Sequence, residues 1–184
     1  MDLLDFSDCK LYFEDPLPVE AEALIQQAAR EYGSSSAELA LLRAHLLAPE
    51  NLTVLVGLYR YYFYQHRLTD ALQVAERAMQ LSGRQLGLPA SWEQLDEKGL
   101  GTAAAASFGL LRFYLLALKA EAVVMLRLGD IDGSRARLKK LLELDTNDRL
   151  GGARLLEVVD EFRPPAMTPP APSASRAPTA PVAA

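Results

Sequence analysis

Residues 52–85, LTVLVGLYRYYFYQHRLTDALQVAERAMQLSGRQ, contain two helical patterns joined by a short break. Large apolar and aromatic side chains recur every three or four positions in the first pattern, and alanines recur in the same way in the second. The break falls at residues 66–69. The positions that carry the two patterns are Leu55, Leu58, Tyr59 and Tyr62, followed by Ala71, Ala75 and Ala78. The stretch therefore predicts one complete helix-turn-helix unit.

Several positions of this unit fit one template for a pair of helices. They are Leu55, Leu58 and Tyr62 in the first helix, and Leu68, Ala71, Ala78 and Leu81 in the second. This pattern resembles the tetratricopeptide repeat, whose second helix has alanines where the two helices cross closely. Tyr59 departs from the family, which usually has glycine or alanine at that position. The resemblance thus implies that the two helices approach less closely at Tyr59.

The pattern recurs on both sides of the central unit. A shift by the family period of about 34 residues moves four landmarks of the unit onto matching residues nearer the N-terminus. The pairs are Leu58 with Leu24, Ala71 with Ala37, Ala78 with Ala44, and Gly83 with Pro49. A third copy fits residues 115–148, where Ser134 takes the position of Ala71 after a spacing of 63 residues. An insertion therefore separates the second copy from the third.

The resemblance implies an all-α protein, built as a right-handed superhelical solenoid of α-hairpins with about three repeats. Residues 1–162 are the expected helical domain. Its repeats lie at about 18–51, 52–85 and 115–148, its insertion at 86–114, and a C-terminal capping helix at about 149–162. Residues 163–184 contain seven of the 11 prolines of the chain among Ala, Ser and Thr. Such a segment cannot bury a core, which predicts a disordered tail.

The insertion contains two further signals. Residues 91–98, SWEQLDEK, predict about two turns of helix, and Gly99, Gly101 and Thr102 predict a break after it. From residue 103 to residue 128, Gly109 alone interrupts the helical pattern. The first helix of the third repeat is therefore expected to extend backwards beyond residue 115.

Composition and charge exclude several classes of function. The formal net charge is −5, and half of the residues are hydrophobic. An acidic body of this kind repels nucleic acid, and no apolar run approaches the roughly 20 residues that span a bilayer. The first ten residues are acidic, where a targeting signal would be basic, so a cytoplasmic location is expected. The single cysteine, Cys9, agrees with a reducing compartment.

No residues in the sequence form a catalytic or metal-binding constellation. His45 and His66 have no His, Cys or acidic neighbour at the spacing of metal ligands. Gly99 and Gly101 follow a short helix and not a strand, and no Gly-Lys-Ser/Thr continuation follows them, which excludes a phosphate-binding loop. We therefore expect neither an enzyme nor a bound cofactor.

The family resemblance also implies a binding groove. In tetratricopeptide proteins the first helix of each repeat forms the concave surface, at fixed positions. On this chain those positions carry mostly basic, aromatic and apolar residues, opposed by Glu22 alone. Such a groove suits an acidic peptide or a chain end with flanking apolar residues. The groove residues are expected to be Arg30, Val56, Arg60, Phe63, Tyr64, Lys119, Val123 and Arg127.

Three functional interpretations follow from these patterns. The first is a scaffold for protein–protein interaction, an adaptor or assembly chaperone that holds a client segment in its concave face. The second is a subunit that stabilises a larger enzyme complex through the convex face or through the insertion that carries Trp92. The third is a homodimer in which exposed aromatics such as Tyr61 and Tyr64 pack against a second copy.

Overall fold

A computed structural model describes residues 16–161, and this part of the chain is entirely helical, without strands. The prediction of an all-α protein is confirmed for these residues. The predicted tail, residues 163–184, and the N-terminal residues 1–15 lie outside the described part. The helices are α1 (Val19–Arg30), α2 (Ser35–Leu47), α3 (Leu52–Tyr64), α4 (Leu68–Gln85), a 3-10 turn η2 (Trp92–Gln94), α5 (Glu97–Ala106), α6 (Phe108–Leu128), α7 (Ile131–Leu144) and α8 (Ala153–Glu161).

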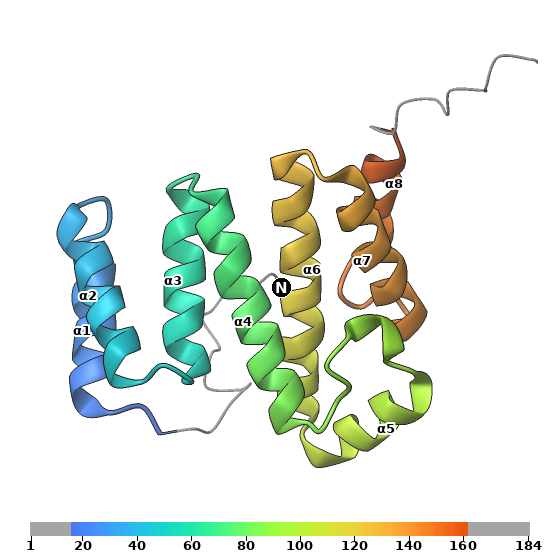
Figure 1. Cartoon of the computed structure of the whole chain (residues 1–184), viewed down its shortest axis with the longest axis horizontal. Helices are drawn as coiled ribbons and strands as arrows, with labels where there is room; N and C mark the ends of the chain where they lie inside the picture. The colour runs from blue at the N-terminus through green and yellow to red at the C-terminus, as the bar shows by residue number, and fades with distance from the viewer. Residues whose placement is uncertain (1–15, 162–184) are drawn as a thin grey trace, which may run out of the picture.

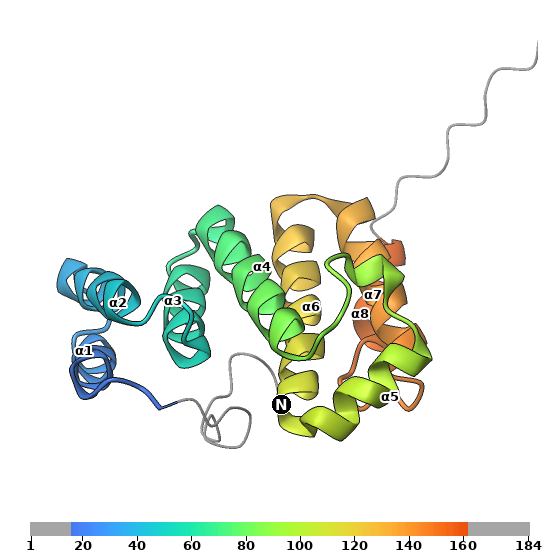
Figure 2. The same ribbon diagram turned by 60° about the horizontal axis from the view of Figure 1, so that its bottom comes forward.

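Apart from α5, which lies across the bottom of the molecule at the right, the helices stand side by side in a row that follows chain order (Figure 1). Hairpins are formed by α1 with α2, by α3 with α4, and by α6 with α7, and α4 packs against α6. Figure 2 shows α1 below α2 and α3 below α4. The core therefore runs through the row as a continuous layer between neighbouring helices.

Small residues permit this close packing in the second helix of each hairpin. Ala37 in α2, Ala71 in α4 and Ser134 in α7 are all completely buried, at 0% exposure. A side chain without bulk lets the facing backbone approach, so that the larger neighbours interlock around it. The residues that follow at helical spacing are also buried: Leu41, Ala75 and Leu138, and then Ala44, Ala78 and Leu141.

The insertion differs from its predicted course. Of residues 91–98, Trp92–Gln94 form the short turn η2, and α5 begins at Glu97. Its N-cap is Asp96, whose carboxylate accepts a hydrogen bond from the Gly99 amide at 2.7 Å. The predicted break at Gly99–Thr102 is wrong, since these residues lie inside α5. Two glycines, the half-buried Gly99 and the exposed Gly101, are tolerated in a helix once an N-cap fixes where it begins.

The long helix predicted for residues 103–128 is interrupted. Ser107 adopts an extended backbone, with φ −159° and ψ 105°, and its hydroxyl accepts a hydrogen bond from the Leu110 amide. The chain turns there, and α6 begins at Phe108. The first helix of the third pair thus extends backwards beyond residue 115, as predicted, but it ends at a cap and does not continue into α5.

The C-terminal helix is shorter than the predicted range of about 149–162. It begins at Ala153, because residues 145–152 form a turn in which Gly151 has a φ of +68°. The Asp148 carboxylate accepts hydrogen bonds from the amides of Gly152 and Ala153. Val159 of α8 is completely buried, and the helix packs on α7. None of the helices within residues 16–161 is both long enough and apolar enough to cross a membrane.

Candidate binding groove

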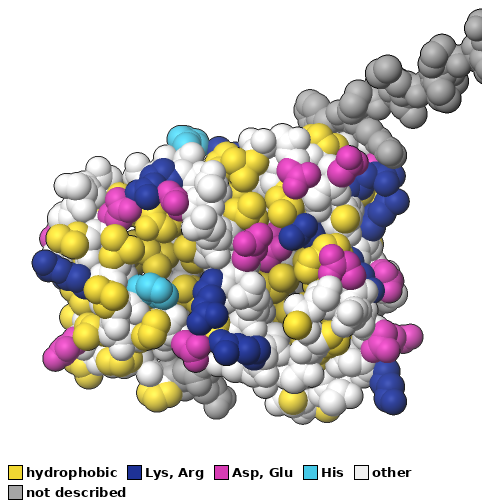
Figure 3. Space-filling view, in the orientation of Figure 1, with side chains coloured by type: hydrophobic (Ala, Val, Ile, Leu, Met, Phe, Trp, Pro, Cys, Tyr) yellow, Lys and Arg dark blue, Asp and Glu magenta, His cyan; other side chains and the backbone are white. Residues whose placement is uncertain are grey.

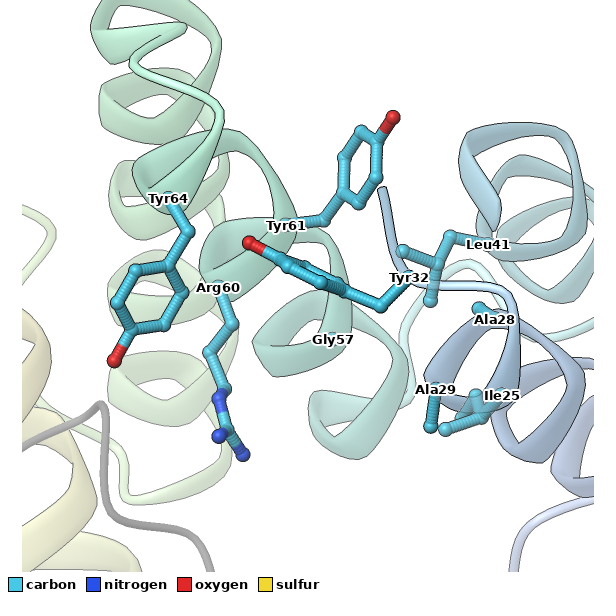
Figure 4. A pocket seen from close by; sticks show the side chains of 9 residues that line it. All are labelled: Ile25, Ala28, Ala29, Tyr32, Leu41, Gly57, Arg60, Tyr61 and Tyr64. Atoms are coloured by element: carbon cyan, nitrogen blue, oxygen red, sulfur yellow. The ribbon is translucent and has the colours of Figure 1, made fainter. Parts of the chain in front are cut away.

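A cavity of about 530 Å³ lies between α1 and α3. Small and aliphatic residues line its inner part, and three tyrosines and an arginine line the rest (Figure 4). The inner residues are Ile25, Ala28, Ala29, Leu41 and Gly57, and the others are Tyr32, Arg60, Tyr61 and Tyr64. We call this cavity the α1–α3 groove.

The space exists because the two facing helices have little side-chain bulk at this point. Ala28 and Ala29 belong to α1, and Gly57 belongs to α3. A Cβ atom at Gly57 would lie 3.1 Å from Cδ2 of Leu41, which leaves no room for a larger residue unless Leu41 moves. Gly57 therefore lets α3 pack closely against Leu41 of α2 in the lining of the groove.

Aromatic side chains form the edges of the groove. Tyr32, just beyond the end of α1, meets Tyr61 edge to face, with ring centroids 6.2 Å apart. Tyr64 lies at the other end and meets Phe63 in the same manner, at 5.8 Å. Tyr32 and Tyr64 remain about half exposed, at 53% and 47%. Each presents a ring and a hydroxyl to whatever occupies the groove.

Two of the predicted groove residues line this cavity, namely Arg60 and Tyr64. In Figure 4 both project from α3 on the same side, with the Arg60 guanidinium below the Tyr64 ring. Arg30 is exposed in the last turn of α1, next to Ala29, but does not line the cavity. The first helix pair and α3 thus supply one cation and exposed tyrosines to a single concave site.

Two predicted groove residues of α3 are core residues instead. Val56 is 4% exposed and Phe63 is 9% exposed. Phe63 stacks on Tyr59, with ring centroids 5.7 Å apart. The helix α3 lies within the row, where α1, α2 and α4 all pack on it and cover more of its surface than an open concave face would allow.

The predicted groove residues of α6 make internal contacts. Lys119 donates a hydrogen bond to the Leu150 carbonyl at 2.6 Å, and Val123 is half-buried against the core. The Arg127 guanidinium lies 4.8 Å from the centre of the Phe63 ring and 2.9 Å from Nδ1 of His66. Because arginine can only donate, His66 accepts through Nδ1. These residues hold elements together and do not line the α1–α3 groove.

Tyr32 and Tyr61 are not among the predicted groove residues. The expectation that Tyr61 is an exposed aromatic is wrong, since it is only 8% exposed and the Tyr32 ring covers it. The sequence signal for Tyr32 is its position directly before Gly33, which has a φ of +95° and lets the chain reverse there. That signal locates the turn but not the direction in which the tyrosine points.

A second polar cluster lies between α6 and α7, away from the groove. Glu121 is completely buried and bonded to Nε of Arg137 at 2.6 Å, and the Arg137 guanidinium lies over the Trp92 ring at 5.2 Å. Burial raises the pKa of Glu121 to about 7, and Arg137 opposes that rise. Burial also raises the pKa of Tyr114 to about 12. Among residues 16–161 no three His, Cys, Asp or Glu side chains cluster in a way that could hold a metal ion.

The geometry defines an all-helical protein with a tyrosine-edged groove between two neighbouring hairpins. No family model and no solved structure matches the chain. The chain is 50% identical over 161 residues to an uncharacterized 19.8 kDa protein in the nifW 5′ region of Azotobacter chroococcum mcd 1. The match covers 88% of this chain and 90% of that protein. The chain therefore belongs to the same protein family as this 19.8 kDa protein.

Proposed function

We propose that the chain is a tetratricopeptide-like scaffold that binds a segment of another protein in the α1–α3 groove. The observation that carries the proposal is the cavity of about 530 Å³ in which Arg60 lies beside the exposed rings of Tyr32 and Tyr64. This volume is within the range of about 300–1,000 Å³ that is typical of ligand sites. The groove is therefore large enough for a few side chains of a client peptide.

Burial in the three hairpins supports the tetratricopeptide-like part of the proposal. Ala37, Ala71 and Ser134 occupy the small-residue position of the repeat template, and all are completely buried. The positions that follow in the same register are buried as well. In this interpretation α8 caps the last hairpin of a right-handed solenoid.

The chemistry of the groove favours an acidic client segment with apolar side chains. A guanidinium binds a carboxylate through charge-assisted hydrogen bonds, which are about twice as strong as neutral ones. The tyrosine rings bury apolar area and lose little conformational entropy, because a tyrosine has only two side-chain torsions. A side-chain carboxylate of Asp or Glu fits these requirements, and so does the C-terminal carboxylate of a peptide. The proposal gives the chain the role of an adaptor or assembly chaperone and assigns it no catalytic residue.

The family relative suggests one concrete client. That protein is named for the region 5′ of nifW in which it is encoded. Proteins encoded side by side often act together, so the nifW product of the same organism is a sensible first candidate. A role as stabilising subunit of a larger enzyme complex would instead use the convex face or the insertion that carries Trp92.

Selection from a displayed peptide library tests the groove with clients of every sequence at once. The wild-type protein should enrich acidic peptides with flanking apolar residues. Arg60→Glu should remove the preference for acidic peptides, and Tyr64→Ala should weaken binding of the selected peptides roughly tenfold or more, as loss of an aromatic anchor does. Lys98→Glu in α5 is the matched control, because Lys98 is an exposed cation remote from the groove.

The outcome distinguishes the groove from other surfaces. If Arg60→Glu and Lys98→Glu enrich the same peptides as the wild type, the client does not bind in the α1–α3 groove. If no peptide is enriched but the nifW product co-purifies with the wild type and not with Arg60→Glu, the groove recognises a folded surface and not a linear segment.

A further inference from the structure

The outer surface of α2 carries a row of exposed leucines. Leu39, Leu42 and Leu46 are 49%, 40% and 80% exposed. Successive helical residues are 100° apart, so these three fall on one face, directly opposite the buried Ala37 and Ala44. We call them the leucine stripe. Figure 3 shows hydrophobic side chains gathered over this end of the molecule, in the part that contains α2.

The other hairpins provide an internal comparison. The second helices α4 and α7 have polar or small residues at the positions that correspond to the leucine stripe. In the register that aligns Ala37, Ala71 and Ser134, Leu39 corresponds to Gln73 and Ala136, Leu42 to Glu76 and Lys139, and Leu46 to Gln80 and Glu143. The packing of a hairpin therefore does not require leucine at these positions. A helix that is apolar on two opposite faces is expected to be covered on both.

We propose that the leucine stripe is a homodimer interface, on which the α2 helix of a second copy of this chain packs. Together, the three leucines of the stripe leave more apolar surface open in each copy than one fully exposed leucine would. That amounts to a few hundred Å², the size at which exposed apolar patches mark interaction sites. A standard interface buries about 800 Å² per partner, so the stripe is the apolar centre of a small interface.

The residues beside the stripe favour a second copy as the occupant. Leu39, Leu42 and Leu46 have the three-and-four spacing of a coiled-coil seam, with Glu38 along one edge and Arg43 along the other. If two α2 helices pack antiparallel, with Leu39 over Leu42 of the partner subunit, Glu38 lies near the partner's His45. The charge of Glu38 is already paired with Arg67 of its own chain at 2.5 Å, so it does not repel the partner. Arg43 then lies near the partner's Ser36. No two like charges face each other, although each chain carries a net charge of −5.

Dimerisation through this face leaves the α1–α3 groove open. Leu41, which lines the groove, points away from the stripe because it lies on the buried side of α2. The dimer would therefore present two groove openings, one in each copy. This inference does not depend on the proposed client and can fail or succeed separately from it.

Sedimentation equilibrium over a range of concentrations tests the dimer. We expect the wild-type chain to shift from its monomer mass of 20.2 kDa to twice that mass, with a dissociation constant on the order of 10–100 μM, as is usual for small interfaces. The triple variant Leu39→Gln, Leu42→Glu, Leu46→Gln gives α2 the residues that α4 carries at these positions. It should stay monomeric at every concentration, with an unchanged helical circular dichroism spectrum.

Val19→Gln is the matched control, because Val19 is an apolar residue of α1 that is 82% exposed and lies outside the stripe. This variant should dimerise as the wild type does. The proposal is overturned if the wild type remains monomeric up to about 500 μM, well above the dissociation constants expected for small interfaces. It is also overturned if the triple variant dimerises as tightly as the wild type.

Cross-linking locates the interface independently of the mass. Leu42→Cys in a Cys9→Ser background should be joined into a covalent dimer by a short bismaleimide. Gln80→Cys in the same background places the thiol at the corresponding position of α4 and should remain a monomer. Cross-linking at position 80 and not at position 42 would place the interface elsewhere and overturn the proposal.

Discussion

Asn51 fixes the start of α3 and is one of the few polar residues in the buried layer. Its side-chain oxygen accepts hydrogen bonds from the Thr53 amide at 3.0 Å and the Val54 amide at 3.4 Å. The residue is 9% exposed, so water cannot easily replace these bonds. The beginning of the helix that forms one wall of the groove therefore depends on a single side chain.

Replacement of Asn51 by alanine should lower the free energy of unfolding by about 1–2 kcal/mol, the usual cost of losing an N-cap. Ser34→Ala is the matched control. Ser34 stands at the same position before α2 but makes no cap hydrogen bond, and its hydroxyl makes only exposed hydrogen bonds, to the Glu31 carbonyl and to Ser36. Urea unfolding of both variants measures the difference. A loss of stability for Ser34→Ala as large as that for Asn51→Ala would contradict the assignment of the cap.

Glu121 makes stability depend on pH. Its carboxyl has an ordinary pKa of 4.5, and burial raises this pKa to about 7 in the folded chain. Below pH 4.5 the group is protonated in both states and has no effect. As the pH rises from 4.5 to 7, the unfolded chain releases this proton and the folded chain keeps it, so stability falls. The loss amounts to about 3 kcal/mol and is complete above pH 7.

Glu121→Gln should abolish this dependence. Glutamine has nearly the same shape and cannot ionise, so the fall in the free energy of unfolding between pH 5 and pH 8 should disappear. What remains is a rise with pH from His45, because burial lowers the pKa of that imidazole. The wild type should lose stability over the same interval. Urea unfolding at several pH values measures both slopes. Parallel slopes for the two proteins would show that another group controls the pH dependence.

Residue exposure in the groove could be predicted only in part from the sequence. Arg60 and Tyr64 line the cavity as expected, because their helical positions place them on the open side of α3. Phe63, predicted beside them, is buried, since neighbours of α3 cover that side. The contact of Lys119 with the Leu150 carbonyl could not be predicted, because 31 positions separate the two residues in the chain.

At the scale of the elements, glycines distinguish a helix end from a helix interior. Gly129 ends α6 in the left-handed conformation, with a φ of +87°. Gly101 lies within α5, and a Cβ atom there would meet nothing within 4 Å. Replacement of glycine by alanine should therefore have opposite effects on the stability of the chain at the two positions.

Gly129→Ala should destabilise the chain by about 1 kcal/mol, because alanine disfavours the left-handed conformation. Gly101→Ala should stabilise it by up to about 1 kcal/mol, because alanine favours the helix. Thermal or urea unfolding of the two variants gives the signs directly. A stabilising effect of Gly129→Ala would mean that α6 does not end at that residue.

The helices themselves could be predicted wherever apolar residues recur at helical spacing, as in α3 and α4. The insertion could not, because its course depends on two caps, at Asp96 and at Ser107. Each cap is a single hydrogen bond from a backbone amide to a side chain. Serine and aspartate occur at many other positions of the sequence, so composition alone does not show which of them cap a helix.

At the scale of the whole molecule, the first helices of the row bury less apolar side-chain surface than the helices near its other end. The buried residues of α1 are only Ala21 and Ala28, whereas α6 buries residues along most of its length. Alanine contributes little apolar area, so the first hairpin depends on its contact with α3. Local opening should therefore begin with α1 and α2.

Hydrogen exchange should reveal this gradient. Amides of α1 and α2 should exchange at least about tenfold faster than amides of α6 when the chain is dilute, because sub-global opening costs less than global unfolding. Mass spectrometry of peptic fragments measures the rates. Equal protection of α1 and α6 would show that the row unfolds as a single cooperative unit. Higher concentration should slow exchange in α2 if the leucine stripe is covered by a second copy.

The all-helical architecture could be predicted from the sequence, and the 34-residue register placed the buried small residues Ala37 and Ala71 correctly. The extent of the groove could not be predicted in the same way. A register assigns residues to faces of single helices, but the groove depends on which neighbours leave a face uncovered. The prediction that residues 163–184 form a disordered tail stays a prediction, because those residues lie outside the described part.

The hydrogen bond from Lys119 to the Leu150 carbonyl has a chemical consequence. An ammonium group held against a carbonyl is a poor nucleophile until it is released and loses a proton. Amine-selective acylating reagents should therefore modify the exposed Lys98 and Lys139 quickly and Lys119 slowly. The slow labelling of Lys119 would record how often the turn before α8 lifts away from α6, in the unaltered protein and without any engineered probe.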